Sequence, residues 1–305
     1  MTPRAQSGAP STSASAAVVH GNGSVEGLRP FLKWAGGKTR LLPKLIPYVP
    51  DTFRNYHEPF LGGGAMFFAV GGRAQSTCYL SDLNDELINT WLVLQDRETE
   101  LRQGLLAFKT NDSESFFYRV RRAIPSQPVD RAARFIYLNQ TAWNGLWRVN
   151  RWGEFNVPWG QRSFRGLDER LVRRIQHALM KSEIRAIDFR QALCSAEAGD
   201  FVYLDPPYLP LSDTSKFHLY TEVRFREADL RELASICESL TARGVRWVLS
   251  NRDTPLIREL FSHSVILGMR IRRSVAAQNR RNIEALDSPE VIVISPGDDE
   301  PPPGS

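Results

Sequence analysis

A strand of four apolar residues, Phe201–Leu204, runs directly into Asp205, Pro206, Pro207 and Tyr208. Two consecutive prolines fix the backbone and remove two N–H donors, so the carbonyl groups of this turn face a ligand without competing donors. The turn therefore presents one carboxylate, one proline carbonyl and one aromatic face, a set that suits a planar substrate with an amino group. A strand that merely ends in an Asx–Pro turn is the alternative, but the apolar strand before this tetrapeptide favours a functional site.

A glycine-rich turn after the predicted strand Tyr56–Phe60 is the second candidate site. It contains Gly62, Gly63 and Gly64, and Asp82 follows Gly62 by 20 positions at the end of the next strand. Glycines let a backbone approach a ligand where a Cβ would clash. Nucleotide-binding βαβ units place an acceptor of ribose hydroxyls at this distance. A plain tight turn is the alternative, and the acid at this spacing favours ligand binding.

The spacing around these glycines also limits the kind of nucleotide. A G-x-G-x-x-G motif for a pyrophosphate is absent, and Gly36-Gly37-Lys38 lacks the spacing of a P-loop. A ligand with a ribose but no phosphate fits better, and S-adenosylmethionine (SAM) is the commonest cofactor of this kind. We therefore expect SAM as the cofactor.

The two candidate sites together indicate methyl transfer to an aromatic amine. The amino nitrogen of adenine is a poor nucleophile because its lone pair is delocalised into the ring. The Asp205 carboxylate and the Pro206 carbonyl can hold both of its hydrogens, which aims the lone pair at a sulfonium methyl, while Tyr208 stacks on the base. This is catalysis by orientation and electrostatic complementarity, without a covalent intermediate.

Strands and helices alternate along the chain, which predicts an α/β fold. The expected strands are 56–60, 78–80, 184–187, 201–204, 245–250, 264–270 and 290–294, and the expected helices are 65–70, 85–94, 227–243 and 255–261. Residues 1–27 and 296–305 have the composition of disordered tails.

The segment 93–182 differs from the rest. It holds 16 Lys/Arg and 9 Asp/Glu, a balance of +7 in a chain whose total is +5, and four of the seven tryptophans. A basic, aromatic-rich insert in an otherwise neutral domain is a candidate nucleic-acid surface. A solvated helical subdomain with a small tryptophan core is the alternative, which composition alone leaves open.

Overall composition excludes several classes of protein. The 305 residues are 42% hydrophobic and 24% charged, as in globular proteins. Three widely spaced cysteines argue against a disulfide scaffold or a zinc site and favour a cytoplasmic location. The five histidines show no metal-ligand spacing, so we expect no metal, and no apolar run approaches the roughly 20 residues that span a bilayer.

At these residues the chain resembles the Dam-type family of SAM-dependent DNA adenine methyltransferases, from about Arg29 to Ile294. The shared motifs occur in the family's order, with the glycine motif, the target-recognition insert and then DPPY. They are FLKWAGGK at 31–38, EPFLGGGA at 58–65, SDLN at 81–84, NGL at 144–146 with Arg148, GEFNVP at 153–158, DPPY at 205–208 and SN at 250–251.

The resemblance implies a Rossmann-like class I methyltransferase sheet and a domain division. Residues 28–92 and 183–295 would form the catalytic domain, and 93–182 a mostly helical target-recognition domain with a β-hairpin. It also implies cofactor contacts beyond the glycine turn. Trp34 and Lys38 would line the SAM site, the backbone from Phe60 to Gly64 would hold the methionine part, and Asp188 with Phe189 would contact the cofactor's adenine. Asp188 as a helix N-cap is the alternative.

The resemblance further implies contacts to double-stranded DNA. Lys33 would reach a guanine, Trp143 would fill the space left by the flipped adenine, Asn144 would contact the same region, and Arg148 would read a guanine with its bidentate fork. Arg151 is a further DNA-binding candidate.

Some residues depart from the family's pattern or play a structural part. We expect Trp143 to be exposed and Trp152 and Trp159 to belong to the hairpin core. Trp147 is bulkier than expected before Arg148. Arg252 stands where many members have histidine, and the basic loop 274–287 cannot be aligned. The recognition sequence is therefore open beyond a short, palindromic site with guanine and adenine.

The residues predict an adenine-specific DNA methyltransferase, and two alternatives stay open. The same chemistry could act on RNA bases or protein amides, although the protein-amide enzymes resemble NPPY rather than DPPY. The second alternative is a non-catalytic DNA-binding regulator with the same fold. The intact DPPY and cofactor motifs argue against it. Monomer or dimer is undetermined, as is the presence of a partner restriction nuclease.

Overall fold

The computed structural model describes residues 28–34, 36–209, 225–272 and 287–296 of the chain. The two predicted tails therefore lie outside the described residues, apart from Pro296, and so do Ala35 of the FLKWAGGK motif and most of the basic loop 274–287. Within the described ranges, no helix is both long and apolar enough to cross a membrane.

Seven strands form a single mixed sheet in the order β3-β2-β1-β4-β5-β7-β6. The strands from β1 to β5 pair in parallel, and β7 pairs antiparallel with both β5 and β6. The strands are β1 (Tyr56–Glu58), β2 (Cys78–Ser81), β3 (Ser182–Arg185), β4 (Phe201–Leu204), β5 (Arg246–Arg252), β6 (Val265–Arg272) and β7 (Asp287–Ile294). The predicted α/β fold is confirmed, and the mostly parallel seven-stranded sheet is consistent with a Rossmann-like methyltransferase.

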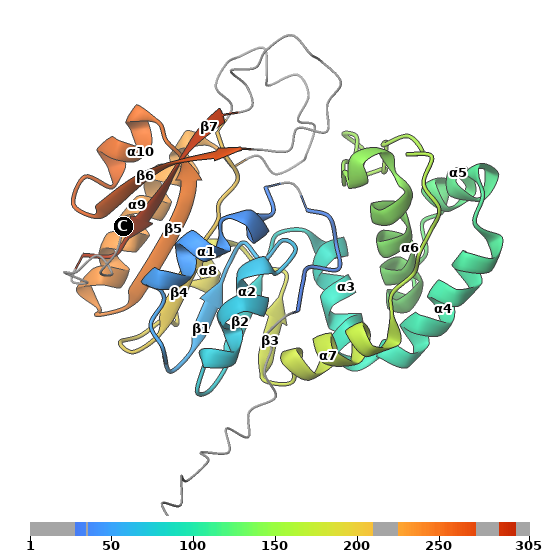
Figure 1. Cartoon of the computed structure of the whole chain (residues 1–305), viewed down its shortest axis with the longest axis horizontal. Coiled ribbons are helices and arrows are strands. Elements are labelled where there is room, and N and C mark those ends of the chain that lie inside the picture. The colour runs from blue at the N-terminus through green and yellow to red at the C-terminus, as the bar shows by residue number, and fades with distance from the viewer. Residues whose placement is uncertain (1–27, 35, 210–224, 273–286, 297–305) are drawn as a thin grey trace, which may run out of the picture.

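Ten α-helices occur in the described part of the chain, and Figure 1 shows them around the sheet. They are α1 (Leu42–Leu45), α2 (Ala65–Val70), α3 (Asp85–Asp96), α4 (Glu98–Asn111), α5 (Glu114–Arg122), α6 (Pro128–Thr141), α7 (Glu169–Leu179), α8 (Phe189–Ala192), α9 (Glu227–Ala242) and α10 (Pro255–Leu260). The helices α4, α5 and α6 stand together at one end of the sheet, on the right of Figure 1.

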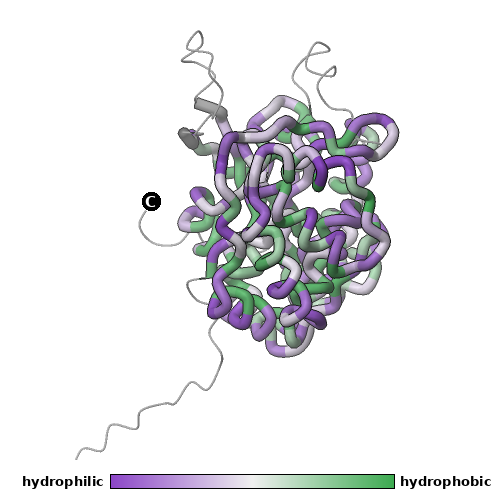
Figure 2. Tube along the Cα trace, turned by 90° about the vertical axis from the view of Figure 1, so that its right-hand side faces the viewer, coloured by the Kyte–Doolittle hydropathy of each residue, from purple (hydrophilic) through white to green (hydrophobic). Residues whose placement is uncertain are grey.

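The side chains of β4 show how the sheet separates two cores. Phe201 and Tyr203 pack with the core that includes α1 and α2, whereas Val202 and Leu204 pack with the core that includes α8, α9 and α10. All four are buried, as expected for a central parallel strand covered on both faces. Figure 2 shows how hydrophobic and hydrophilic residues are distributed along the trace.

The order of the strands changes direction between β1 and β4. From β1 the chain moves outward to β2 and β3, and β4, which pairs with the other side of β1, leads outward to β5. The carboxyl ends of β1 and β4 therefore diverge into loops on opposite sides, and ligands of open α/β sheets bind at such a switch point. The glycine turn follows β1 and the DPPY turn follows β4, so the fold brings the two motifs to this point.

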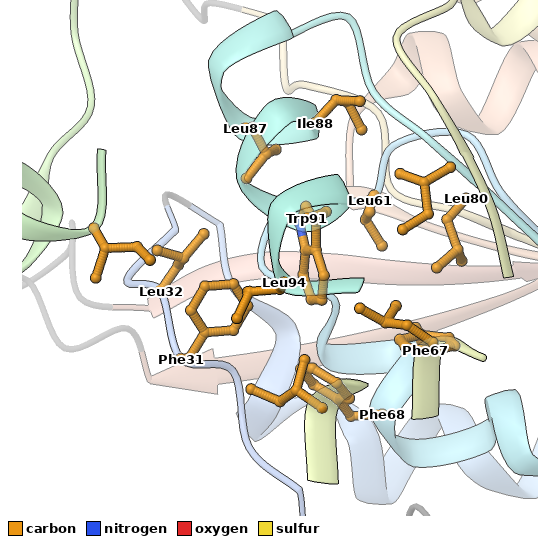
Figure 3. Packing of buried hydrophobic residues seen from close by; sticks show 14 of the residues in the cluster. Phe31, Leu32, Leu61, Phe67, Phe68, Leu80, Leu87, Ile88, Trp91 and Leu94 are labelled. Atoms are coloured by element: carbon orange, nitrogen blue, oxygen red, sulfur yellow. The ribbon is translucent and has the colours of Figure 1, made fainter. Parts of the chain in front are cut away.

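Aromatic packing fixes the segment before α1 against the glycine turn. Phe31 meets Trp91 edge-on with ring centroids 5.0 Å apart, and Phe68 lies 5.6 Å from the same indole. Figure 3 shows these residues together. The indole Nε1 of Trp91 donates to the carbonyl oxygen of Gly62 at 3.2 Å. Helix α3 thereby positions the turn through a buried side chain.

Most predicted element boundaries agree with the structure to within two residues, and β4 and α2 agree fully. The strand predicted at 290–294 is the exception, since β7 starts three residues earlier, at Asp287. The strand predicted at 184–187 is shifted by two residues at both ends, because β3 starts at Ser182 and ends at Arg185. Its register is set by pairing with β2, where Cys78 faces Ser182. Ile187 thus follows the strand, and Asp188 caps α8 by accepting from the Arg190 N–H.

The basic insert is mostly helical, as predicted, and α6 packs along α3. The predicted boundary after residue 92 falls inside α3, which ends at Asp96. The predicted β-hairpin takes the form of two isolated antiparallel bridges, Ala142 with Trp159 and Val149 with Phe155, rather than two continuous strands.

Candidate active site

Asp205 stands at the carboxyl end of β4, between the ends of β1 and β5. Its Oδ1 atom accepts from the Ser250 hydroxyl at 3.2 Å, and the Ser250 Oγ lies 3.0 Å from the Tyr203 hydroxyl. Pro206 is buried and Pro207 exposed. The carboxylate is therefore oriented by two neighbouring strands before any substrate is present.

Lys38 is the closest charged partner of this carboxylate. Its ammonium lies 2.6 Å from Oδ1 of Asp205, donates to the Gly36 carbonyl at 3.1 Å and lies 4.8 Å from the centroid of the Tyr208 ring. Only 7% of Lys38 is exposed. Burial alone would lower the pKa of Lys38, but the Asp205 carboxylate and Tyr208 outweigh burial and raise it to about 12. Lys38 is thus a cation at neutral pH.

Burial also acts on the two acidic groups of this corner. It raises the pKa of Asp205, and the Lys38 ammonium and the Ser250 hydroxyl oppose that rise. It raises the pKa of Tyr208 to about 12, so the phenol is neutral. The Lys38 ammonium, 2.6 Å from Oδ1, favours the carboxylate form of Asp205, in which both oxygens accept hydrogen bonds.

The glycine turn is tied to β2 by hydrogen bonds. The Leu61 N–H donates to the Ser81 carbonyl at 2.9 Å, and the Gly62 N–H donates to Oδ2 of Asp82 at 3.0 Å. Oδ1 of Asp82 accepts from the Asn84 N–H at 3.0 Å. Burial raises the pKa of Asp82, and these backbone donors oppose the rise. Asp82 therefore shapes the turn, whatever else it binds.

Two glycines of the turn have left-handed backbones, with φ of 48° at Gly62 and 68° at Gly64. A Cβ at Gly62 would lie 2.6 Å from the Trp34 ring, and one at Gly64 would lie 2.8 Å from the Trp91 ring. The absence of a side chain at these two positions thus permits the left-handed backbone and also leaves room for the two indole rings. Trp34 is half-buried and stacks at 6.2 Å on Phe135 of α6.

An aromatic cluster lies beside the turn. Phe60 lies 5.5 Å from Phe189 and 6.0 Å from Phe225, measured between ring centroids. Phe225 was not foreseen from the sequence, because it joins the cluster through a contact between distant parts of the chain. Phe60 and Phe189 could be predicted because each lies in a recognised motif. No such motif lies next to Phe225 in the sequence.

Asp188 is the N-cap of helix α8, which was the predicted alternative to a cofactor contact. It also forms an ion pair with Arg190, whose other nitrogen bonds Asp229 of α9 at 2.6 Å. These contacts leave Asp188 at the rim of the same cleft as Phe189 and Asp229. The N-cap role and a ligand contact are compatible, because a carboxylate has about four acceptor positions.

Glu58 is a second residue without a predicted role. It ends β1, is 2% exposed and accepts from the Tyr56 hydroxyl at 2.8 Å. Burial raises its pKa well above the ordinary value. A carboxyl group that favours its neutral form therefore lies next to the glycine turn.

One cleft of about 1930 Å³ joins these elements. Predicted site residues along its wall are Lys33, Trp34, Lys38, Phe60, Gly62, Gly63, Asp82, Asn144, Asp188, Phe189, Asp205, Pro206, Pro207 and Tyr208. The predicted residues Gly64, Trp143, Arg148 and Arg151 are not part of that wall. The predicted catalytic residues and all predicted cofactor residues except Gly64 therefore meet in one place, and the DNA-binding candidates extend beyond it.

The insert approaches the cleft through Asn144 and Gly145. Asn144 has a left-handed backbone with φ of 56°, which is uncommon outside glycine, and Gly145 follows with φ of 67°. The Asn139 side chain bonds both the N–H and the carbonyl of Lys33, at 2.9 and 2.8 Å. Burial, followed by Arg162 and Arg165, lowers the pKa of Lys33. Several cations thus converge where the insert meets the catalytic domain.

The tryptophans of the insert fall into exposed and partly buried side chains, and one of them differs from the prediction. Trp143 is 45% exposed and Trp159 packs against the core, as predicted. The expectation for Trp152 is wrong, since 67% of it is exposed. The turn at Asn150–Gly153, with a left-handed Gly153, directs this side chain away from the core that Trp147 enters.

Comparison with known proteins agrees with this arrangement. Residues 34–275 match the family described as D12 class N6 adenine-specific DNA methyltransferase. The chain is 37% identical to the Type II methyltransferase M1.LlaDCHI of Lactococcus lactis subsp. cremoris, over 77% of this chain and 84% of that protein. It is 36% identical to the Type II methyltransferase M.MjaIII of Methanocaldococcus jannaschii, over 73% and 84%.

It is also 32% identical to the DNA adenine methylase of Escherichia coli (strain K12), over 85% of this chain and 94% of that protein. Among the described residues, no group of three or more His, Cys, Asp or Glu side chains is placed to hold a metal ion. The chain belongs to the D12 class of N6 adenine-specific DNA methyltransferases.

Proposed function

We propose that the protein transfers a methyl group from SAM to the N6 atom of an adenine flipped out of double-stranded DNA. The observation that carries the proposal is the convergence, in one cleft, of the Asp205 corner, the glycine turn and Asp82 at the ends of three neighbouring parallel strands. Family membership favours DNA over RNA bases and protein amides as the substrate.

The residues present fit SAM. Asp82 has acceptor positions left for ribose hydroxyls after its two backbone bonds, and Phe60, Phe189 and Phe225 offer aromatic faces for an adenine ring. Asp188, at the rim, would accept from the amino group of that ring. Trp34 and the Phe60–Gly64 backbone would hold the methionine part. When bound, SAM supplies an electrophilic methyl group on a sulfonium sulfur.

At the reacting centre, Asp205 and Pro206 hold the amino group of the target. Lys38 and Ser250 both contact Oδ1 of Asp205, so Oδ2 is the oxygen best placed to accept an amino hydrogen. The Pro206 carbonyl would accept the second hydrogen, and Tyr208 would stack on the base. SAM would supply the methyl group to this amino nitrogen and would leave as a neutral thioether. The nitrogen then releases a proton to water, so no histidine base is needed.

The basic insert would bind the duplex. Its balance of +7 suits a polyanion. The proposed base contacts are Asn144 and Arg148 of the insert and Lys33 of the catalytic domain beside it. Residues 93–182 would thus form the target-recognition domain, and residues 28–92 and 183–295 the catalytic domain.

The direct test is modified-base sequencing of DNA from an unmethylated host that expresses the protein, with Asp205→Ala as the matched control. We expect N6-methyladenine in one short sequence context in the wild type and a far smaller methylated fraction of the same sites in the variant. Methylation of cytosine, or equal methylation by both proteins, would contradict the proposal.

A further inference from the structure

Residues 148–156 of the insert form a short arm whose shape is fixed by its own hydrogen bonds. At its base, the Arg148 side chain donates to Oδ1 of Asn156 at 2.7 Å. At its tip, Oδ1 of Asn150 accepts from the backbone N–H groups of Trp152 and Glu154, both at 3.0 Å. The Asn150 side chain also donates to the Glu154 carboxylate at 2.8 Å. The tip is therefore preorganised without a ligand.

The arm is also anchored to the helices of the insert. The Trp147 ring, just before the arm, packs 4.0 Å from Phe135 of α6 and 4.9 Å from Phe155 inside the arm. Arg121 of α5 donates to the Phe155 carbonyl at 3.1 Å. Motion of the tip relative to the helical part is thereby restricted, and the tip acts as a fixed projection.

This projection carries an exposed indole. Trp152 is 67% exposed, and the Arg151 guanidinium lies 4.1 Å from the centroid of its ring. A planar guanidinium at this distance covers one face of the indole. The other face is available to a planar partner, and a rigid tip that exposes so much apolar area needs a functional reason.

The surroundings of the tip indicate which partner this is. Trp152 lies on the wall of the cleft that contains Asp205, together with Arg121, Arg122 and Ile124. Ile124, in the loop after α5, is 86% exposed. Apolar side chains framed by arginines suit nucleic acid, in which flat bases alternate with phosphates.

We propose that Trp152 stacks through its open face on a nucleobase of the bound duplex while Arg151 pairs with a backbone phosphate. This contact is separate from those proposed for Trp143, Asn144 and Lys33, and it rests on the proposed function insofar as DNA is the substrate. Stacking of a base on an aromatic ring contributes about 1–3 kcal/mol, so the contact would account for about tenfold or more in DNA affinity.

Three substitutions at Trp152 test the stacking. Fluorescence anisotropy with the full chain and a labelled duplex of the methylated sequence would measure the dissociation constant. We expect Trp152→Ala and Trp152→Leu to weaken binding about tenfold or more, and Trp152→Phe to restore most of it. Equal binding by the Leu variant and the wild type would overturn stacking, because an aliphatic side chain can pack on a sugar but cannot stack.

Met180→Ala is the matched control, since Met180 is 72% exposed and lies outside this cleft. It should bind DNA as the wild type does. Arg151→Gln should reduce the slope of log affinity against log salt by about one, and an unchanged slope would overturn the phosphate contact.

Methyl transfer by the wild type separates this inference from the proposed function. If the wild type methylates adenine and Trp152→Ala binds DNA unchanged, the stacking contact alone is wrong. If the wild type methylates no DNA, the proposed function is wrong. Because Trp152 is exposed, thermal unfolding of its variants should match that of the wild type.

Discussion

The catalytic corner and the DNA-contacting insert position their side chains by different means. At the corner, Asp205 follows a buried parallel strand and is bonded to Lys38 and Ser250, so the sheet fixes it. In the insert, Asn144 and Trp152 stand on loops whose shape depends on left-handed residues and local side-chain bonds. The difference implies that corner variants should lose chemistry while they still bind DNA, whereas insert variants should lose DNA binding while they retain chemistry.

The largest effect is expected at Asp205. Asp205→Ala removes an acceptor of the target amine, and loss of one preorganised group at a reacting centre costs about a hundredfold to a thousandfold in rate. Single-turnover methyl transfer at saturating DNA measures this loss, and anisotropy measures DNA affinity. An equal loss of DNA affinity would break the division between the two regions.

Asp82 comes next. Asp82→Ala removes the proposed ribose acceptor. It also leaves the Gly62 and Asn84 N–H groups without their acceptor, which should lower the free energy of unfolding by about 1–3 kcal/mol. Titration calorimetry should show SAM binding weakened about tenfold to a hundredfold. Asp188→Ala, at the rim, is the comparison and should weaken SAM binding less. Unchanged SAM binding in Asp82→Ala would remove Asp82 from the cofactor site.

Lys38 should show a pH-dependent effect. Its folded-state pKa of about 12 lies above the ordinary lysine pKa of 10.5, so its contribution to stability is complete below about pH 10.5 and disappears as the pH rises towards 12. That contribution is about 2 kcal/mol. Denaturant unfolding of the wild type and Lys38→Met from pH 9 to about 12 would measure it. The difference between the two proteins should shrink with rising pH, and a constant difference would contradict the ion-pair argument.

The smallest effect is expected at Arg148. Its bond to Asn156 is exposed, so Arg148→Ala should change the free energy of unfolding by less than about 0.5 kcal/mol. If Arg148 reads a guanine, the variant should discriminate against a changed base about tenfold less. Methyl transfer to matched and singly substituted duplexes tests this. If the variant methylated the matched duplex at saturation with a lower single-turnover rate, Arg148 would take part in catalysis at the Asp205 corner and not only in DNA recognition.

Sequence reasoning performed best where a local signal is strong. The strand Phe201–Leu204 is apolar, preceded by Gly199 and Asp200 and followed by Asp205 and two prolines, and the helix Ala65–Val70 is bounded by glycines, so both were predicted to the residue. At β3 the apolar residues Ile184 and Ile187 fit more than one register, and pairing with β2 decided between them.

Contacts between distant segments explain the remaining differences. The Lys38–Asp205 pair joins residues far apart in the chain, and only the family resemblance suggested that Lys38 lines the cofactor site. Phe225 joins Phe60 in the same way. Trp152 was misplaced because composition favours a buried tryptophan, whereas the Asn150 bonds at the tip direct it outward.

The place of Lys38 has a further consequence for the charge that an arriving base meets. Its ammonium is above the ring of Tyr208, and it balances the charge of Asp205 at Oδ1. An adenine stacked on this ring would lie beside the ammonium and turn its amino group towards Oδ2. The corner would thus stay electrically neutral until the attacked nitrogen becomes positive, and only then would the carboxylate face a second cation.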